Sequence, residues 1–326
     1  MPHRLRVLEL FCGIGGCAAA VGDRAHVVAA VDINSVAVAA YRRNSPSPPL
    51  HVRTIESLPA AWYGDLNAEL WWLSPPCQPY TSRGRRRDLH DDRAQGLLAV
   101  IERIAELRPR YVGLENVAGF QGSQSHQRLR ATLDACGYQV REQILCPIQL
   151  GIPNRRPRFY LVASRAGRLV DQAGPSWSEV PRPAAWRFPV RQILDSAPAD
   201  TLWMSDEFHE RFRGAVHVVD AADPHAETHC FTSSYGTSVV RSGSYLATPR
   251  GVRRFSPTEI LRLLCFPAGF RLPDELPLRK AWQLVGNSLS VAAVRQVLAA
   301  IPELGGLALD ATLDVAGAGS QPAFRL

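Results

Sequence analysis

Along the first half of the chain, short apolar runs alternate with stretches in which apolar residues recur at the spacing of a helix. The run from Arg6 to Phe11 leads through a glycine-rich turn into an alanine-rich stretch, and the run HVVAAVDIN precedes a helical stretch from Ser35 to Asn44. Strands that alternate with helices usually pair in parallel and are covered on both faces, so this pattern predicts an α/β fold with a mostly parallel sheet. The further predicted elements are the strands LWWL, YVGLEN and RFYLVAS and the helices near Ala94 to Leu107 and Gln127 to Cys136.

The pattern changes after Ser164. Residues 165–200 are rich in proline, tryptophan and arginine, and residues 215–250 have the alternation of short strands separated by turns. Helical character returns in SPTEILRLLCF, where Ser256 can cap a helix and Glu259 can complete a capping box. A turn at VGNS and a last helix at about Ser290 to Ile301 follow. We therefore predict two domains, with residues 1–170 and 271–326 in the larger one and residues 171–270 in a small irregular one.

Composition narrows the class of protein. The 326 residues carry a formal net charge of +7 and only one lysine, Lys280, so arginines supply nearly all the positive charge. Arginine suits phosphates and base edges, which favours a nucleic-acid partner, although a compositional bias of the genome would look the same. Seven scattered cysteines without a CxxC pair argue against a disulfide framework and a zinc site. No apolar run suits a membrane span or a signal peptide, so we expect a cytoplasmic protein without a membrane partner.

The first glycine-rich turn has the spacing of a nucleotide-binding loop. Gly13, Gly15 and Ala18 fit GxGxxA, and Asp32 lies 19 residues after Gly13 at the end of the second predicted strand. Small residues allow a ligand close to the backbone, and the carboxylate can accept hydrogen bonds from ribose hydroxyls. This motif alone leaves three readings open: an NAD-type cofactor, an adenosyl cofactor, or a structural turn.

A proline-flanked cysteine follows the third predicted strand. In Ser74-Pro75-Pro76-Cys77-Gln78-Pro79 the thiol lies at the carboxyl end of a strand, where α/β sheets bind ligands. Adjacent prolines fix the local backbone and can hold a thiol toward a cleft. A lone cysteine is most often a small buried residue, but this context favours a reactive thiol.

Five motifs in order, FCGIGG, SPPCQP, LENV, IPNRRPR and VGNS, resemble those of the cytosine carbon-5 methyltransferase family and span about residues 5–295. The resemblance implies a Rossmann-like methyltransferase domain for residues 1–170 and 271–326 and a target-recognition domain for residues 171–270. It also implies transfer of a methyl group from S-adenosylmethionine to carbon-5 of cytosine in nucleic acid. The adenosyl cofactor is thereby favoured over NAD.

The resemblance also assigns roles to individual residues. Carbon-5 of cytosine is a poor nucleophile, and addition of a thiolate at carbon-6 activates it, so Cys77 is the expected nucleophile. Glu115 would act at ring nitrogen 3, which requires a protonated carboxyl and hence a raised pKa. Arg156 and Arg158 would hold the cytosine oxygen and orient the carboxylate, and their spacing along RRPRFYLVA would put both on one face of a strand. Asn154 stands where many members have glutamine. The implied cofactor-binding residues are Phe11, Gly13, Ile14, Gly15, Gly16, Asp32, Ile55, Glu56, Ser74, Asn287 and Ser288.

Within the family, the chain is most similar to the small branch that methylates an anticodon-loop cytidine of transfer RNA for aspartate. The motifs CQPYT, ENVAGF, LGIPN and Cys230-Phe231-Thr232, followed by Tyr235-Gly236, carry this likeness. An unpaired base is cheaper to extrude than a paired one, and no duplex-reading element is evident between residues 165 and 250, so tRNA is favoured over duplex DNA. The expected substrate contacts are Gln78, Thr81, Arg83, Arg85, Arg86, Arg87, Cys230, Phe231 and Thr232.

Three alternatives stay open at this point. A DNA cytosine methyltransferase, alone or in a restriction-modification system, would use the same catalytic residues. An NAD-dependent oxidoreductase is favoured by GxGxxA alone. A non-catalytic RNA-binding homologue would keep the motifs without turnover.

Overall fold

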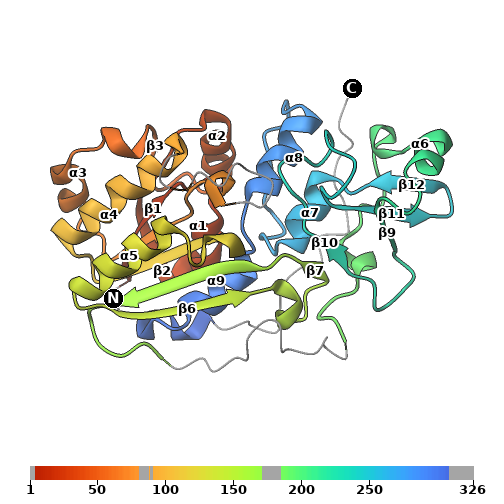
Figure 1. The fold of residues 1–326 in the computed structure, drawn as a ribbon. Coiled ribbons are helices and arrows are strands. Elements are labelled where there is room, and N and C mark those ends of the chain that lie inside the picture. The colour runs from red at the N-terminus through yellow and green to blue at the C-terminus, as the bar shows by residue number, and fades with distance from the viewer. Residues whose placement is uncertain (1–3, 81–87, 89–90, 171–184, 308–326) are drawn as a thin grey trace. The chain divides into compact units, whose positions relative to one another are not determined.

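The computed structural model describes residues 4–80, 88, 91–170 and 185–307 (Figure 1). Contacts group the chain into two compact units, residues 1–145, 157–180 and 293–310 in the first and residues 146–156, 181–292 and 311–326 in the second. These limits differ from the predicted boundaries at residues 170 and 271, chiefly because residues 146–156 and 271–292 group with the second unit. How the units correspond to functional domains stays a prediction, and each unit is described by itself below.

The first unit contains a seven-stranded sheet of order β3-β2-β1-β4-β5-β8-β6. All pairs from β3 to β5 are parallel, whereas β8 runs antiparallel to both of its neighbours. The mostly parallel α/β fold is thus confirmed. The strands are β1 (Leu5–Leu10), β2 (Ala25–Asp32), β3 (Leu50–Val52), β4 (Leu70–Leu73), β5 (Tyr111–Val117), β6 (Gln139–Leu145) and β8 (Arg158–Ser164).

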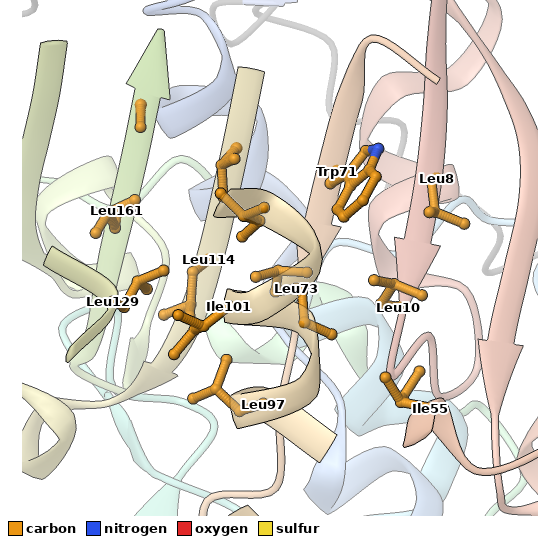
Figure 2. Packing of buried hydrophobic residues seen from close by; sticks show 14 of the residues in the cluster. Leu8, Leu10, Ile55, Trp71, Leu73, Leu97, Ile101, Leu114, Leu129 and Leu161 are labelled. Carbon is orange, nitrogen blue, oxygen red and sulfur yellow. The ribbon is translucent and has the colours of Figure 1, made fainter. Parts of the chain in front are cut away.

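Side-chain alternation along β1 distributes the helices over the two faces of the sheet. Leu8 and Leu10 belong to the buried cluster formed with α3 (Ala60–Asp65), α4 (Gln95–Leu107) and α5 (Gln124–Ala135), part of which Figure 2 shows. Glu9 points to the opposite face. There it meets α1 (Gly16–Val21) and α2 (Ser35–Asn44), and Arg295 of α9 (Val291–Leu298) donates a hydrogen bond to the carbonyl of Ala20 in α1.

Local capping explains where several helices begin and end. The Asn34 side chain accepts hydrogen bonds from the amides of Val36 and Ala37 and so starts α2. Helix α4 ends at Leu107, and its capping residue Arg108 adopts a left-handed conformation immediately before Pro109. Among the described residues, no helix is long and apolar enough to cross a membrane.

The second unit consists of short elements, as its sequence predicts. Strands β12 (Gly251–Arg254), β11 (Ser244–Thr248) and β9 (His217–Asp220) form one sheet, and β10 (Thr228–His229) pairs with β7 (Asn154–Arg155) in another. The helices are α6 (Asp206–Arg211), α7 (Pro257–Leu263) and α8 (Leu278–Asn287).

The predicted turn at VGNS is wrong, because Val285, Gly286 and Asn287 form the last turn of α8. Gly286 is needed there for close packing. A Cβ at this position would lie 2.3 Å from the carbonyl of Thr232. Glycine thus brings α8 against the Cys230-Phe231-Thr232 segment without ending the helix. The last helix, α9, is also shorter than predicted.

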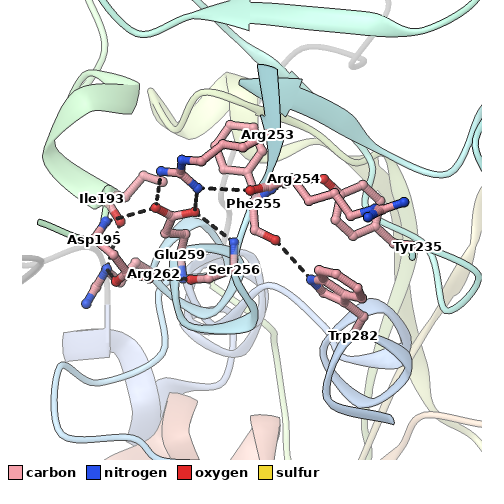
Figure 3. Close-up of polar contacts among 10 residues, drawn as sticks. All are labelled: Ile193, Asp195, Tyr235, Arg253, Arg254, Phe255, Ser256, Glu259, Arg262 and Trp282. Atoms are coloured by element: carbon pink, nitrogen blue, oxygen red, sulfur yellow. Dashed lines mark hydrogen bonds and ion pairs between the residues drawn. The ribbon is translucent and has the colours of Figure 1, made fainter. Parts of the chain in front are cut away.

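A polar network fixes the start of α7 inside the second unit (Figure 3). The predicted capping box is confirmed, since the Ser256 hydroxyl accepts from the amide of Glu259 and the Glu259 carboxylate accepts from the amide of Ser256. The same carboxylate also forms an ion pair with Arg253, and both side chains are buried. Trp282 of α8 donates to the carbonyl of Phe255, which attaches α8 to this network.

Candidate active site

Four predicted site residues form one row at the carboxyl ends of adjacent parallel strands. Leu10 of β1 pairs with Val31 of β2 and with Leu73 of β4, and Leu73 pairs with Leu114 of β5. The next residues along the chain are Phe11, Asp32, Ser74 and Glu115. Phe11 and Ser74 lie just past β1 and β4, whereas Asp32 and Glu115 still belong to β2 and β5. Neighbouring strands lie about 4.8 Å apart, so the row spans about 15 Å. It lies at the carboxyl edge of the strands, the edge at which α/β sheets bind ligands.

The glycine turn after β1 depends on its glycines. Gly13 and Gly15 have φ values of +53° and +88°, and a Cβ on Gly15 would lie 2.8 Å from the ring of Tyr41. Phe11 also has a positive φ, +56°, which is strained for a bulky residue. At Gly13 a Cβ would meet nothing within 4 Å, so the turn leaves room for a ligand beside its backbone.

Asp32 holds this turn from the end of β2. Its carboxylate accepts hydrogen bonds from the amides of Gly13 and Asn34, each at 2.8 Å. Burial raises the pKa of Asp32, and these backbone hydrogen bonds oppose the rise. A carboxylate offers about four acceptor directions, so Asp32 can hold the turn and still accept from a ribose hydroxyl. Ile33, which follows it, is 68% exposed and adds an apolar surface at this edge.

A buried carboxyl beneath the turn was not anticipated from the sequence. Glu9 accepts hydrogen bonds from the Cys17 amide at 3.0 Å and from the Tyr41 hydroxyl at 2.7 Å. Desolvation raises its pKa to about 7. The available signal was an acidic residue within the otherwise apolar run VLEL. Glu9 thus ties α1 and α2 to the strand that carries the turn.

The residues expected to flank an adenine lie on a short 3-10 helix, Ile55–Ser57. Ile55 is buried, whereas Glu56 is exposed. A Cβ on Gly96 of α4 would lie 3.0 Å from the Phe11 ring and 3.2 Å from a Glu56 carboxylate oxygen. Phe11 and Glu56 therefore converge on Gly96, which sequence reasoning missed.

The segment that carries Cys77 is fixed by hydrogen bonds on both sides. Ser74 donates its amide to the carbonyl of Leu10, and its hydroxyl accepts from the Trp72 indole at 3.0 Å. The buried Asn116 of β5 donates its side-chain amide to the carbonyl of Pro75 at 3.1 Å. Cys77 is partly exposed, unlike a cysteine of the core, and Gln78 beside it is exposed.

Glu115 and Arg158 face each other across the antiparallel pair of β5 and β8. The Arg158 Nε atom lies 3.4 Å from a Glu115 carboxylate oxygen, and both side chains are largely buried. A second Arg158 nitrogen donates to the carbonyl of Pro157. This pair gives the carboxyl a defined orientation at the edge of the sheet. The protonated state expected for Glu115 stays a prediction.

Arg156 has a different environment from Arg158. The predicted alternation assumed one continuous strand, but β7 ends at Arg155 and β8 begins at Arg158. The buried Arg156 guanidinium donates to the carbonyls of Phe231, at 2.8 Å, and of Gly286 and Ser288 in the second unit. These contacts favour a positioning role over the cytosine contact implied by resemblance.

The remaining predicted residues divide into two groups. Cys230, Phe231, Thr232, Asn287 and Ser288 belong to the second unit. Phe231 is 2% exposed and packs edge-on against Tyr235 and Phe255, which favours a packing role over a direct substrate contact. The second group, Thr81, Arg83, Arg85, Arg86 and Arg87, lies outside the described residues.

Comparison with known proteins identifies the family of this chain. The sequence profile of the C-5 cytosine-specific DNA methylases matches residues 5–212 and 210–303. The chain belongs to this family. Human tRNA (cytosine(38)-C(5))-methyltransferase is 29% identical to this cytosine C-5 methylase, over 90% of the chain and 98% of the human protein. The enzyme of the same name from Schizosaccharomyces pombe is 31% identical, over 92% and 97%.

A solved structure extends the likeness to the fold of this cytosine C-5 methylase. The crystal structure of a Spodoptera frugiperda DNMT2 mutant superimposes with a TM-score of 0.80 at 26% identity, over 92% of this chain and 99% of that one. Cytosine C-5 methylases are S-adenosylmethionine-dependent, and the open side of the Gly13 turn and the acceptor at Asp32 fit such a cofactor.

Proposed function

We propose that this methylase transfers a methyl group from S-adenosylmethionine to carbon-5 of a cytosine in tRNA, with an anticodon-loop cytidine of tRNA-Asp as the favoured substrate. The observation that carries the proposal is the row formed by Phe11, Asp32, Ser74 and Glu115. It brings the turn suited to the cofactor and the segment that carries Cys77 to one edge of one sheet.

Different residues of the chain would contact the ribose, the methionine portion and the adenine of the cofactor. Asp32 would accept from the ribose hydroxyls, and the backbone of the Gly13 to Gly16 turn would hold the methionine portion. Phe11 and the residues around Ile55 would contact the adenine. When bound, S-adenosylmethionine supplies an electrophilic methyl group. The family resemblance also implies cofactor contacts for Asn287 and Ser288, which belong to the second unit.

The base is activated by addition. The Cys77 thiolate forms a bond to carbon-6 of the cytosine, and the ring electrons move toward nitrogen 3. Glu115, oriented by Arg158, donates a proton or a hydrogen bond to nitrogen 3 and so stabilises this charge. Carbon-5 would then form its bond to the methyl group as the bond from that group to sulfur breaks, with its electron pair left on the sulfur of S-adenosylhomocysteine. Loss of the carbon-5 proton to a base returns an electron pair that expels the thiolate and restores the ring.

The choice of tRNA rests on the relatives and on the cost of exposing the base. The human and S. pombe relatives are named as tRNA cytosine-38 methyltransferases, and both match nearly the whole chain. A base must leave its stack before a thiol can reach carbon-6, which costs a few kcal/mol in a duplex and less in a loop. A second unit built of short strands is sufficient for a substrate whose base is already unpaired.

The test compares two substrates and three proteins. Unmodified tRNA-Asp and duplex DNA are incubated with labelled S-adenosylmethionine and the wild type, Cys77→Ala or Cys136→Ala, and methylated positions are mapped by bisulfite sequencing. Cys136 is the matched control, because it is also partly exposed but lies at the end of α5.

We expect wild type and Cys136→Ala to methylate tRNA-Asp, and Cys77→Ala to be inactive with cofactor affinity within about threefold of wild type. Preferential methylation of duplex DNA would replace the tRNA assignment with a DNA methyltransferase. Absence of methylation on both substrates would refute the proposed activity.

A further inference from the structure

We propose that Tyr80, Ser125 and Asp88 are positioning residues for the Cys77 nucleophile, acting as a hydrogen-bonded chain that anchors the nucleophile segment to α5. This inference rests on the proposed function, because it assigns Cys77 a reaction. It adds three residues to which neither the family resemblance nor the row of strand ends assigns a role, although Tyr80 lies within the motif CQPYT.

Tyr80 is the link to the nucleophile. Its amide donates to the carbonyl of Cys77 at 3.0 Å, so the two residues close one turn of the short helix Gln78–Tyr80. Its side chain is buried, and its hydroxyl donates to the Ser125 hydroxyl at 2.9 Å. Burial raises the pKa of Tyr80 to about 12, so the phenol stays a donor at physiological pH.

Ser125 and Asp88 continue the chain. The Ser125 hydroxyl, which accepts from Tyr80, donates its own proton to Asp88 at 2.7 Å. Asp88 also accepts from the backbone amides of Gln124 and Ser125 at 2.5 and 3.1 Å. These amides lie in the first turn of α5, where a carboxylate is favoured by the helix dipole. Ser125 is fully buried, so no bulk water can replace its hydroxyl as the partner of Tyr80.

The backbone of Tyr80 is held from the other side by β5 and its following turn. A Cβ on Gly119 would lie 2.5 Å from the carbonyl oxygen of Tyr80, and the ring of Phe120 packs edge-on against the Tyr80 ring at 4.9 Å. The hydroxyl, the ring and the main chain of Tyr80 are thus each fixed. Because Tyr80 follows Cys77 by only three positions, a displacement of Tyr80 would also displace Cys77.

Helix α5 supplies a matched control for this role. Ser123 caps the helix, and its hydroxyl accepts from the amide of His126. Ser123→Ala therefore removes a hydrogen bond from the same helix end as Ser125→Ala, without touching the contact to Tyr80. A purely structural role for Ser125 would make the two variants alike in every rate.

The experiment measures kcat, KM for both substrates, melting temperature and two reactions of the thiol in the full-length chain. Variants are Ser125→Ala, Tyr80→Phe, their combination, Asp88→Asn, Ser125→Thr and the control Ser123→Ala. One thiol reaction is formation of the covalent adduct with tRNA carrying 5-fluorocytidine, which cannot lose a proton from carbon-5 and so retains the enzyme. The other is alkylation of Cys77 by iodoacetamide, followed by mass spectrometry, which requires no methyl transfer.

We expect Ser125→Ala, Tyr80→Phe and Asp88→Asn to lower kcat and the adduct rate by about 10- to 100-fold, the effect of a small misplacement of a reacting group. KM for S-adenosylmethionine should change by less than about threefold. The double variant should be no slower than its slower parent, because both changes break one link. Ser125→Thr keeps the hydroxyl and should recover activity, and the alkylation rate of Cys77 should change in Ser125→Ala but not in Ser123→Ala.

Equal kcat, adduct and alkylation rates for Ser125→Ala and Ser123→Ala would overturn the positioning role. If wild type methylates nothing, the proposed function fails, and the alkylation rates still decide whether this hydrogen-bonded chain positions Cys77.

Discussion

The buried ion pair between Arg253 and Glu259 is expected to dominate the stability of the second unit. The Glu259 carboxylate accepts from two Arg253 nitrogens at 2.8 and 2.6 Å and from the amides of Ser256 and Asp195 at 2.8 Å each (Figure 3). The side chains of Arg253 and Glu259 are 2% and 0% exposed. Glu259→Ala would thus leave a guanidinium and two backbone donors without this acceptor in a place that water does not reach.

Removal of one partner from a buried ion pair costs about 3–5 kcal/mol, because the other charge stays buried. We take a loss of about 4 kcal/mol for Glu259→Ala. For a unit of this size each kcal/mol lowers the melting temperature by about 2–4 °C, so the expected decrease is about 8–16 °C. Replacement of both partners, as in Arg253→Met with Glu259→Leu, removes the charge imbalance and should recover about half of the loss or more. It does not satisfy the two amides, so full recovery is not expected.

Urea titration followed by tryptophan fluorescence measures the free energies of unfolding, and thermal unfolding followed by circular dichroism measures the melting temperatures. Asp134→Ala is the control, because Asp134 pairs with Arg130 on the exposed side of α5 and should cost less than about 1 kcal/mol. The reasoning is refuted if Glu259→Ala costs no more than this surface variant, or if the double variant is less stable than Glu259→Ala.

Three further predictions concern the first unit. The folded-state pKa of about 7 for Glu9 exceeds its ordinary value of 4.5, so the folded chain retains a proton that the unfolded chain loses. The free energy of unfolding of the wild type should therefore fall by about 3 kcal/mol between pH 4.5 and 7 and then level off. Urea titrations of Glu9→Gln should lack this decline. Identical pH profiles for the two proteins would contradict the assignment. The Cβ of Gly119→Ala would lie 2.5 Å from the Tyr80 carbonyl oxygen, so this variant should lose about 1–3 kcal/mol of stability and some activity. Gly64→Ala is the control, because its Cβ would meet nothing within 4 Å and should not destabilise the fold. Equal stability of the two variants would exclude the clash. Asp32→Ala should weaken S-adenosylmethionine binding by about 1–3 kcal/mol in calorimetry, and unchanged affinity would reject that contact.

The features that the sequence predicted depend on local rules. Glycines in the turn after β1, prolines before Cys77 and the capping residues around Ser256 each constrain their own few residues of backbone, so their patterns can be read directly. Strand β6 was missed because its sequence, QVREQIL, mixes charges into a strand whose side chains are mostly half-buried. The turn expected at VGNS was wrong because a glycine can also serve close packing within a helix, and only the neighbouring Thr232 shows which of the two applies.

The contacts that the sequence could not predict join residues far apart in the chain. Asp88 and Ser125 are 37 residues apart, and Arg156 reaches Ser288 across 132 residues. Neither pair has a spacing that a strand or helix period would single out. Only the tertiary structure identifies such pairs. Packing excludes water from both partners, and a buried polar group without a partner is costly.

Arg156 and Arg158 show how far a motif can determine roles. They are two residues apart in the same family motif, yet Arg156 donates to carbonyls distant in the chain, whereas Arg158 pairs with the carboxylate of Glu115 and donates to the neighbouring Pro157 carbonyl. Arg156 donates to carbonyls on both the Cys230-Phe231-Thr232 segment and the end of α8, so its charge is used to hold two main-chain segments of the second unit together. Arg158 orients a carboxyl at the edge of the sheet, where a reacting base would lie. The motif alone does not separate the two side chains, whereas the interruption at Pro157 between β7 and β8 gives them different partners.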